Sequence, residues 1–239
     1  MKELAEFTPR EARGLIRAGE YAAQTSGMCP GYAQCNLAAI PKEYADDFLR
    51  FTQLNPRPCP VLEVVPAGER LTKLIASGAD VARDIPKYRV YEYGRLTGEY
   101  ADASAFWRDD LVAFLIGCSF SFEDALLREH IPVRHIEQGR NVPMYNTNIL
   151  LKSAGVFGGN MVVSMRPMAP EDAERAAEVT ARFPRVHGAP VHVGDPKEIG
   201  IPDIGCPDYG DAVEIKPGET TVFWACGVTP QAAVMRAKL

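Results

Sequence analysis

Two segments of the chain share one pattern of apolar and polar positions. Each starts with an apolar run, at Leu111 and at Thr221, and passes through a cysteine and a short turn into a segment of helical character. The pattern predicts a buried strand leading into a helix, with Ser121 and Thr229, three residues after each cysteine, as candidate N-caps. The first amides of a helix lack intrahelical acceptors and its dipole is positive there, so two such corners of one sheet predict a shared carboxylate-binding pocket.

The remaining pattern predicts alternating helices and strands. A capping box runs from Thr8 to Glu11, with proline at the first helical position. Helices are predicted over 8–21, 31–40, 42–54, 69–76 and 170–182, and strands over 59–65, 88–93, 133–137, 148–152 and 160–165. These elements predict an α/β fold with a layered αβα main domain, residues 1–131 plus 187–239, and an inserted smaller α+β subdomain, residues 132–186.

Composition narrows the class of protein. Apolar residues make up 46% and charged residues 24%, as in ordinary globular proteins. The net charge of −5 and the scattered basic residues argue against a nucleic-acid partner. The longest apolar run, 111–118, is too short to span a membrane, and the first residues lack a signal core, which predicts a cytoplasmic protein. The six cysteines form no C-x-x-C pair, so reduced thiols are expected. The composition does not decide whether the protein forms a homo-oligomer.

Several ordered blocks carry a family resemblance. They are residues 25–27, 31–36, 114–123, 141–148, 163–167, 187–192 and 223–231. Together they resemble the bacterial hydro-lyase family of the D-glutamate cyclase type. The resemblance implies an α/β fold with two subdomains and an enzyme related to one that converts D-glutamate to 5-oxo-D-proline and water. In the segment Asp80–Asp84 the basic residue is shifted by one from the family pattern, so no role is carried onto Arg83.

Lactam formation requires a neutral amine, an activated γ-carboxyl, an acid–base group and an anchor for the α-carboxylate. Arg166 at a strand end is the candidate anchor, because arginine binds carboxylates with two parallel hydrogen bonds; a salt bridge is the alternative. Tyr145, Asn146 and Asn148 form a polar run suited to a substrate amine and carboxylate, or to turn chemistry.

Two histidines are candidate acid–base groups. His187 and His192 lie in a loop, with Asp195 nearby as a third ligand for a divalent metal. Glu123 is a candidate proton donor, although a carboxylate also suits the first turn of a helix. The alternative for both histidines is a hydrogen bond to the backbone.

The two corners add further candidates. Cys226 is a candidate nucleophile, and so is Cys118, because a helix N-terminus stabilises a thiolate; buried apolar packing is the alternative. Backbone amides and hydroxyls of the corners are candidate substrate contacts, namely those of Ser119, Ser121, Gly227 and Thr229. Gln34 and Asn36 are further candidates for the pocket wall, or for a capping role.

The leading hypothesis is a hydro-lyase acting on a small amino or hydroxy carboxylic acid. No dinucleotide or phosphate-binding glycine motif occurs, so no organic cofactor is expected, while a divalent metal stays open. Two other functions are also open: a non-catalytic protein that binds a carboxylate metabolite, and a cysteine-dependent amidohydrolase.

Overall fold

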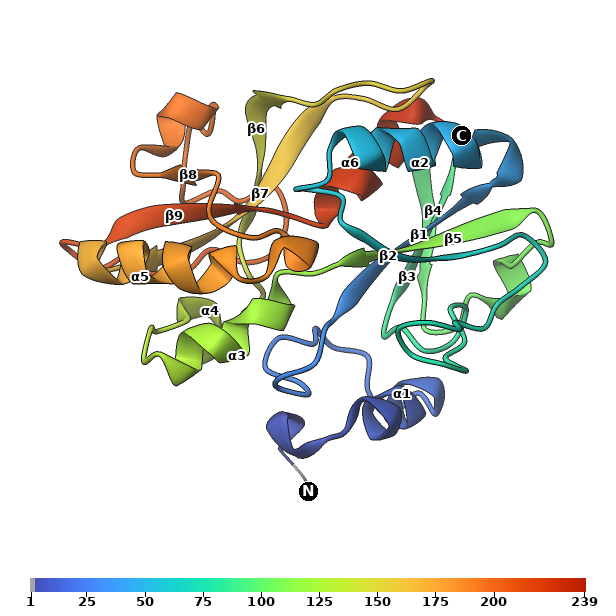
Figure 1. The fold of residues 1–239 in the computed structure, drawn as a ribbon, viewed down its shortest axis with the longest axis horizontal. Coiled ribbons are helices and arrows are strands. Elements are labelled where there is room, and N and C mark those ends of the chain that lie inside the picture. Colours follow the sequence, from blue (N-terminus) through green and yellow to red (C-terminus); the bar gives the residue numbers. More distant parts are fainter. Residues whose placement is uncertain (1–2) are drawn as a thin grey trace.

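The computed structural model describes residues 3–239 and has the predicted α/β class (Figure 1). Its strands form a three-stranded sheet in the order β1-β5-β2, a β3-β4 hairpin and a four-stranded sheet in the order β6-β7-β9-β8. The strands are β1 (Cys35–Pro41), β2 (Val61–Val65), β3 (Tyr88–Glu92), β4 (Arg95–Tyr100), β5 (Leu111–Gly117), β6 (Met144–Leu150), β7 (Asn160–Met168), β8 (His192–Val193) and β9 (Thr220–Ala225). The α-helices are α1 (Pro9–Arg17), α2 (Lys42–Leu54), α3 (Phe120–Arg128), α4 (Arg134–Glu137), α5 (Pro170–Ala181) and α6 (Val228–Ala237).

The two larger sheets exchange their helices at the centre of the molecule. Strands β5 and β9 approach each other from opposite ends, and their carboxyl ends meet in the middle (Figure 1). Helix α3 follows β5 but packs Phe122 and Leu126 against Trp224 of β9. Helix α6 follows β9 but packs Ala233 into the core that contains Phe114 of β5. The chain therefore crosses from one sheet to the other at both corners.

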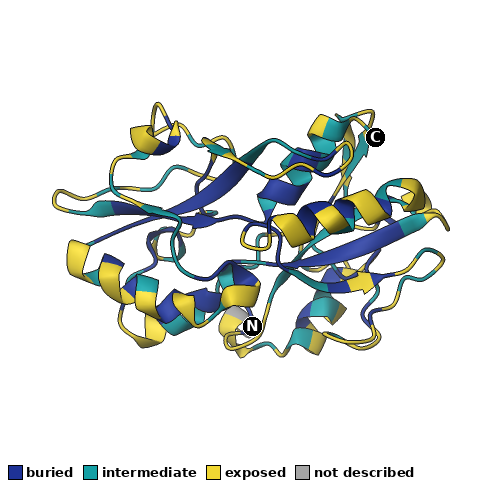
Figure 2. Cartoon of the chain, turned by 45° about the horizontal axis from the view of Figure 1, so that its top comes forward, coloured by how far each residue is buried: buried dark blue, intermediate teal, exposed yellow. Residues whose placement is uncertain are grey.

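Separate apolar cores hold the two halves. Around the first sheet, aromatic rings pack edge to face, as Phe48 does with Phe114 and Phe157 at centroid distances of 4.8 and 5.0 Å. Around the second sheet, the Trp224 indole is fully buried and donates to Thr180 Oγ1 of α5 at 3.0 Å. Figure 2 shows the buried residues following the strands, while the outward faces of the helices are exposed.

The corners differ in two ways from the sequence prediction. They belong to two sheets rather than to one, and every paired strand runs antiparallel among the described residues. The predicted caps Ser121 and Thr229 are wrong, because the helices begin earlier, with Ser119 and Gly227 at the N-cap positions. Strand β7 of the predicted subdomain 132–186 pairs with β9 outside it, and the domain division stays a prediction.

Of the other predicted helices and strands, some are confirmed and some are wrong. The capping box at Thr8 is confirmed, although α1 ends at Arg17, and α2 has the predicted bounds. The segment predicted as a helix over 31–40 instead supplies strand β1, whose whole length pairs with β5. The predicted strand over 133–137 is instead the short helix α4, in which buried Arg134 reaches Glu219 at 2.5 Å.

The helix predicted over 69–76 is absent. The buried carboxylate of Glu63 accepts hydrogen bonds from the backbone amides of Lys73, Leu74 and Ile75 at 2.6–3.1 Å. Those amides therefore point to one side chain instead of along a helix axis. Leu74 is left exposed at the surface, so the helical spacing of apolar residues here does not reflect burial.

Candidate functional site at the junction of the two sheets

The two corners have the same local geometry, as their shared pattern suggests. The Cys118 thiol accepts a hydrogen bond from the Phe120 amide, and the Cys226 thiol accepts one from the Val228 amide. Each cysteine thus binds the first amide of its helix, a role that a Ser or Thr hydroxyl usually fills. The two thiols lie near enough to each other that ionisation of Cys226 would raise the pKa of Cys118.

Asn36 of β1 lies between the corners. A Cβ placed on Gly227 would approach Asn36 Nδ2 to 2.1 Å and the Gly117 carbonyl oxygen to 3.6 Å. Glycine at position 227 therefore leaves room for the Asn36 amide, since its φ of −65° requires no special freedom. This contact shows that the two strand ends face each other across a polar side chain rather than an apolar plug.

A buried ion pair forms the centre of the junction. Arg166 of β7 donates from Nη2 to Glu123 Oε1 of α3 at 2.5 Å. His135 Nε2 lies 2.9 Å from the same oxygen, and Ser26 Oγ donates to Glu123 Oε2 at 2.6 Å. All four residues are at most 5% exposed. Because a carboxylate only accepts, His135 Nε2 carries a proton in this arrangement and donates it to Glu123.

One nitrogen of the Arg166 guanidinium has no hydrogen-bond partner among the described residues. The guanidinium lies over the Phe122 and Trp224 rings at 5.3 Å from each centroid, and Nη1 and Nη2 reach Ser164 Oγ and Ser119 Oγ at 3.2 and 3.3 Å. Its Nε is buried and has no hydrogen-bond partner in the described part of the chain. A buried unpaired donor costs free energy, which marks this atom as a site for a bound acceptor.

Burial and charge oppose each other at Glu123. Burial raises the pKa of this carboxyl, but the Arg166 charge and the hydrogen bonds from His135 and Ser26 outweigh it and hold the pKa below its ordinary value. Burial lowers the pKa of His135, and Glu123 only partly reverses this. At neutral pH the cluster therefore contains a carboxylate, a guanidinium and a neutral imidazole.

His187 places a free acceptor next to this cluster. Its ring Nδ1 lies 2.8 Å from the Arg57 carbonyl oxygen, which can only accept, so Nδ1 carries the proton of the neutral ring. Nε2 then presents a lone pair. It is buried and forms no hydrogen bond of ordinary geometry among residues 3–239, although the Gly117 carbonyl also lies near the ring and favours its protonated form. Burial and, to a smaller extent, the nearby Arg166 charge together lower the pKa of His187 to about 4.

The corner cysteines are not activated as a helix N-terminus alone suggests. Burial raises the pKa of the Cys118 thiol to about 12 and that of the Cys226 thiol to about 11, although the amides of Phe120 and Val228 partly offset this. Both are therefore neutral thiols at pH 7. The expected stabilisation of a thiolate at these positions is wrong, because loss of solvation outweighs the helix dipole.

The other corner candidates tie the corners to neighbouring strands. Ser121 Oγ accepts from the Gln34 amide at 2.8 Å. Thr229 Oγ1 accepts from the Val162 amide at 3.0 Å and lies 3.1 Å from its carbonyl oxygen. These hydroxyls are engaged with backbone, whereas Ser119 Oγ directly contacts Arg166.

Four candidates lie away from the junction. Tyr145 donates from its hydroxyl to the Ile204 carbonyl at 2.7 Å, and Asn148 packs against Gly200. His192 pairs with Phe223, and its Nε2 lies 2.9 Å from the carbonyl oxygen of Asp195. Asn146 lines an open cleft of about 560 Å³ beside α6. The polar run at 145–148 therefore does not converge on Arg166.

Two residues of the cluster were absent from the sequence candidates. Ser26 lies in a loop that is rich in Gly, Pro and small polar residues, and His135 lies in a segment predicted as a strand. The strand prediction is wrong, because Val133 is buried as in a strand while Arg134 and His135 are buried for their polar contacts.

Within residues 3–239 no three His, Cys, Asp or Glu side chains are grouped to hold a metal ion. The proposed third ligand Asp195 instead caps a short 3-10 helix by accepting from the Lys197 amide. No helix in the described chain has the length and apolar character to cross a bilayer.

Comparison with known proteins gives the family. The family model for D-glutamate cyclase matches residues 112–239. A protein from Corynebacterium urealyticum named "Putative hydro-lyase" is 60% identical, over 98% of this chain and 88% of its own. One from Thermoanaerobacter is 59% identical over 96% and 87%, and one from Clostridium beijerinckii is 56% identical over 99% and 90%. The chain therefore belongs to the D-glutamate cyclase family, whose relatives are named as hydro-lyases, a class of carbon–oxygen lyase.

Proposed function

We propose that this protein is a hydro-lyase that acts on a small amino or hydroxy carboxylic acid, with D-glutamate closing to 5-oxo-D-proline as the specific reaction. Family membership supports the reaction class. The observation that carries the proposal is the pair of unsatisfied buried atoms, Arg166 Nε and His187 Nε2, at the junction of the two sheets. One is a charged donor and the other a neutral acceptor.

These two atoms match the two charged groups on the α-carbon of an amino acid, the carboxylate and the ammonium. Arg166 Nε would donate to the α-carboxylate, and Glu123 would keep the guanidinium in place through its contact with Nη2. His187 Nε2 would accept a proton from the substrate ammonium, because the Arg57 carbonyl holds the ring in the tautomer with Nδ1 protonated. A bound carboxylate beside His187 favours its protonated form, which strengthens it as a base.

Proton balance requires no outside donor. The ammonium group loses two protons when the nitrogen becomes the lactam amide, and the γ-carboxylate needs two protons for one of its oxygens to leave as water. His187 can carry both in turn from nitrogen to oxygen. Ser119 Oγ, held at 3.3 Å from Arg166 Nη2, would hydrogen-bond the reacting carboxyl.

Product analysis tests this function. The purified protein is incubated with D-glutamate, with L-glutamate and with a panel of small hydroxy acids, and products are detected by chiral chromatography and mass spectrometry. D-Glutamate labelled with ¹⁸O in the γ-carboxyl should transfer one label to water. If no substrate loses water, the lyase assignment is wrong, and ligand-dependent thermal stabilisation without turnover would instead indicate a carboxylate-binding protein.

Two variants connect the reaction to the site. His187→Asn should abolish turnover, whereas His130→Asn should not, because His130 is exposed and has a similar left-handed backbone. The cysteine-dependent amidohydrolase is disfavoured by the raised pKa of both corner thiols.

A further inference from the structure

The buried cluster is covered by an N-terminal segment with a small core of its own. Residues 3–34 include α1 and the loop that carries Ser26. The buried members of their apolar cluster are Ala12, Met28 and Cys29, and the partly buried members are Phe7 and Tyr21. Every described member of this cluster comes from the segment itself. Its apolar packing therefore stays intact if the segment moves as a unit.

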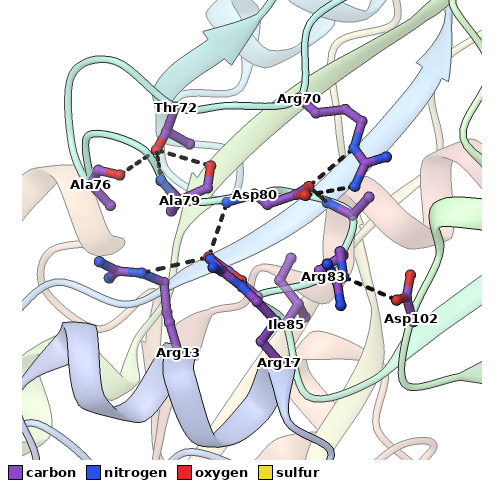
Figure 3. A network of polar contacts seen from close by, with 12 residues as sticks. Arg13, Arg17, Arg70, Thr72, Ala76, Ala79, Asp80, Arg83, Ile85 and Asp102 are labelled. Carbon is purple, nitrogen blue, oxygen red and sulfur yellow. Dashed lines mark hydrogen bonds and ion pairs between the residues drawn. The ribbon is translucent and has the colours of Figure 1, made fainter.

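Polar contacts attach this segment to the body of the protein. Asp84, which is 8% exposed, accepts from Arg17 Nε and Nη2 at 2.7 Å each, and Arg13 Nε lies 3.8 Å away. Figure 3 shows Arg13 and Arg17 pointing from α1 towards the loop that carries Asp80. Asp84 also accepts from the Asp80 amide at 2.9 Å, which fixes its position in the loop before β3. This two-point contact joins α1 to the body through charge, and Ile16 of α1 is buried in addition, outside the segment's own cluster.

Ser26 supplies the contact at the other end. Its hydroxyl donates to Glu123 Oε2 at 2.6 Å and lies 3.3 Å from His135 Nε2, although it is 97 residues from Glu123 in the chain. The loop is further held by Gln34, whose amide donates to Ser121 at 2.8 Å and whose side chain binds back to Thr25. Closure of the segment thus completes the hydrogen bonding of Glu123.

We propose that residues 3–34 form a cap that opens to admit the substrate, that the Arg17–Asp84 pair holds the cap closed, and that Ser26 is a positioning residue for Glu123 and His135. The assignment of the cap to substrate entry rests on the proposed function. The reason is geometric, because Arg166 is fully buried and Ser26 is the residue that reaches Glu123 from the covering segment. The Arg17 side chain is 44% exposed and Asp84 is almost fully buried, so opening the cap requires separation of this pair but disrupts neither main core.

Hydrogen exchange tests the cap without any substrate. Arg17→Ala removes the contact with Asp84, and Arg83→Ala is the matched control, because Arg83 pairs with Asp102 nearby and its side chain is 43% exposed against 44% for Arg17. We expect amides in residues 18–34 to exchange at least about tenfold faster in Arg17→Ala than in the control. Equal exchange in the two variants would overturn the cap.

Titration of His135 by NMR tests the positioning role. The charged groups that face His135 are Glu123 of α3 and Arg166 of β7. Ser26→Ala removes one hydrogen bond to Glu123 Oε2, so Glu123 should stabilise the proton on His135 more strongly. The pKa of His135 should therefore rise by up to about one unit, a tenfold change in proton affinity. Ser26→Thr, which keeps a hydroxyl, should restore the titration. A His135 titration that is unchanged in Ser26→Ala would overturn the role.

Turnover then separates the two proposals. If D-glutamate is cyclised, Ser26→Ala should lower kcat by about tenfold or more with a smaller effect on KM, and Ser26→Thr should recover much of it. Unchanged kcat would show that Ser26 does not position the reacting groups. If no substrate is turned over, the proposed function fails, while the exchange and titration results still decide whether the cap and its Ser26 contact exist.

Discussion

The Arg166 guanidinium and the Glu123 carboxylate meet at 2.5 Å in an almost fully buried ion pair that connects strand β7 to helix α3. The two residues are 43 positions apart and belong to elements that the two corners bring together. Such a pair contributes less through net attraction than through the penalty of breaking it, because each partner alone would be an unpaired buried charge. The pair therefore keeps the shape of the junction in the absence of ligand.

Arg166→Met should destabilise the protein by about 3–5 kcal/mol, because Glu123 would be left as a buried carboxylate without its cation. The measurement is urea unfolding at pH 7. Adding Glu123→Gln to Arg166→Met should recover part of the loss. Arg108→Ala, which breaks an exposed pair with Asp110, serves as the control and should change stability by less than about 1 kcal/mol. A similar small effect for Arg166→Met would show that the pair is not buried in solution.

The sequence predicts the corners better than their surroundings. Matching strand–turn–helix units are predicted from the apolar runs of β5 and β9 and from the cysteine that follows each run. This works because burial and turn chemistry act within a few residues. That the two units exchange partners between sheets depends on contacts such as Phe122 with Trp224, which no local pattern encodes.

The sequence predicts some residues of the candidate site and misses others. Arg166 and Glu123 are found from charge next to a strand end and a helix start, and His187 from its chemistry. Ser26 and His135 are not found, because their role comes from contacts with Glu123 over 97 and 12 positions and from burial that depends on tertiary packing. Strand β1 is missed for the same reason, since β5 supplies its hydrogen bonds.

His187 should make stability depend on pH between about 6.5 and 4. The folded pKa is lowered to about 4, while the unfolded chain titrates near about 6.5, so the unfolded state binds more protons in this window. Stability is therefore present above pH 6.5 and falls as the pH drops towards 4, by up to about 1.4 kcal/mol per unit.

Urea unfolding across this range measures the slope. His187→Asn, which suits the left-handed backbone at φ 88°, should flatten it, whereas His130→Asn at φ 58° should leave it unchanged. If both variants keep the full slope, then another group, such as His135 with its lowered pKa, accounts for the acid sensitivity in this range.

Thiol labelling should distinguish Cys206 from the corner cysteines. Cys206 is exposed, although Asp203 raises its pKa, whereas Cys118 and Cys226 lose solvation and their pKa values rise to about 12 and about 11. Iodoacetamide at pH 7.5 should therefore modify Cys206 first in the folded protein, as peptide mass spectrometry would show, because the thiolate is the reacting form. Rapid labelling of Cys226 would revive the amidohydrolase hypothesis, and Cys206→Ser provides the control for the fast phase.

Gly227→Ala should destabilise the junction through Asn36. The added Cβ would lie 2.1 Å from Asn36 Nδ2, so the amide between the two corners must move, at a cost of about 1–3 kcal/mol. The backbone contributes no strain, because φ at this position is −65°. Asn36→Ala in the same chain frees the space, so the double variant should lose less than the sum of the single ones, as a double-mutant cycle of urea unfolding would show.

Gly14→Ala is the control for this substitution. Gly14 lies within α1, and its added Cβ would meet no atom within 4 Å, so the change should stabilise the protein by about 0.5–1 kcal/mol. Additive effects of Gly227→Ala and Asn36→Ala on stability would mean that the added Cβ at position 227 does not contact the Asn36 side chain. That result would argue against a shared junction at the carboxyl ends of β5 and β9.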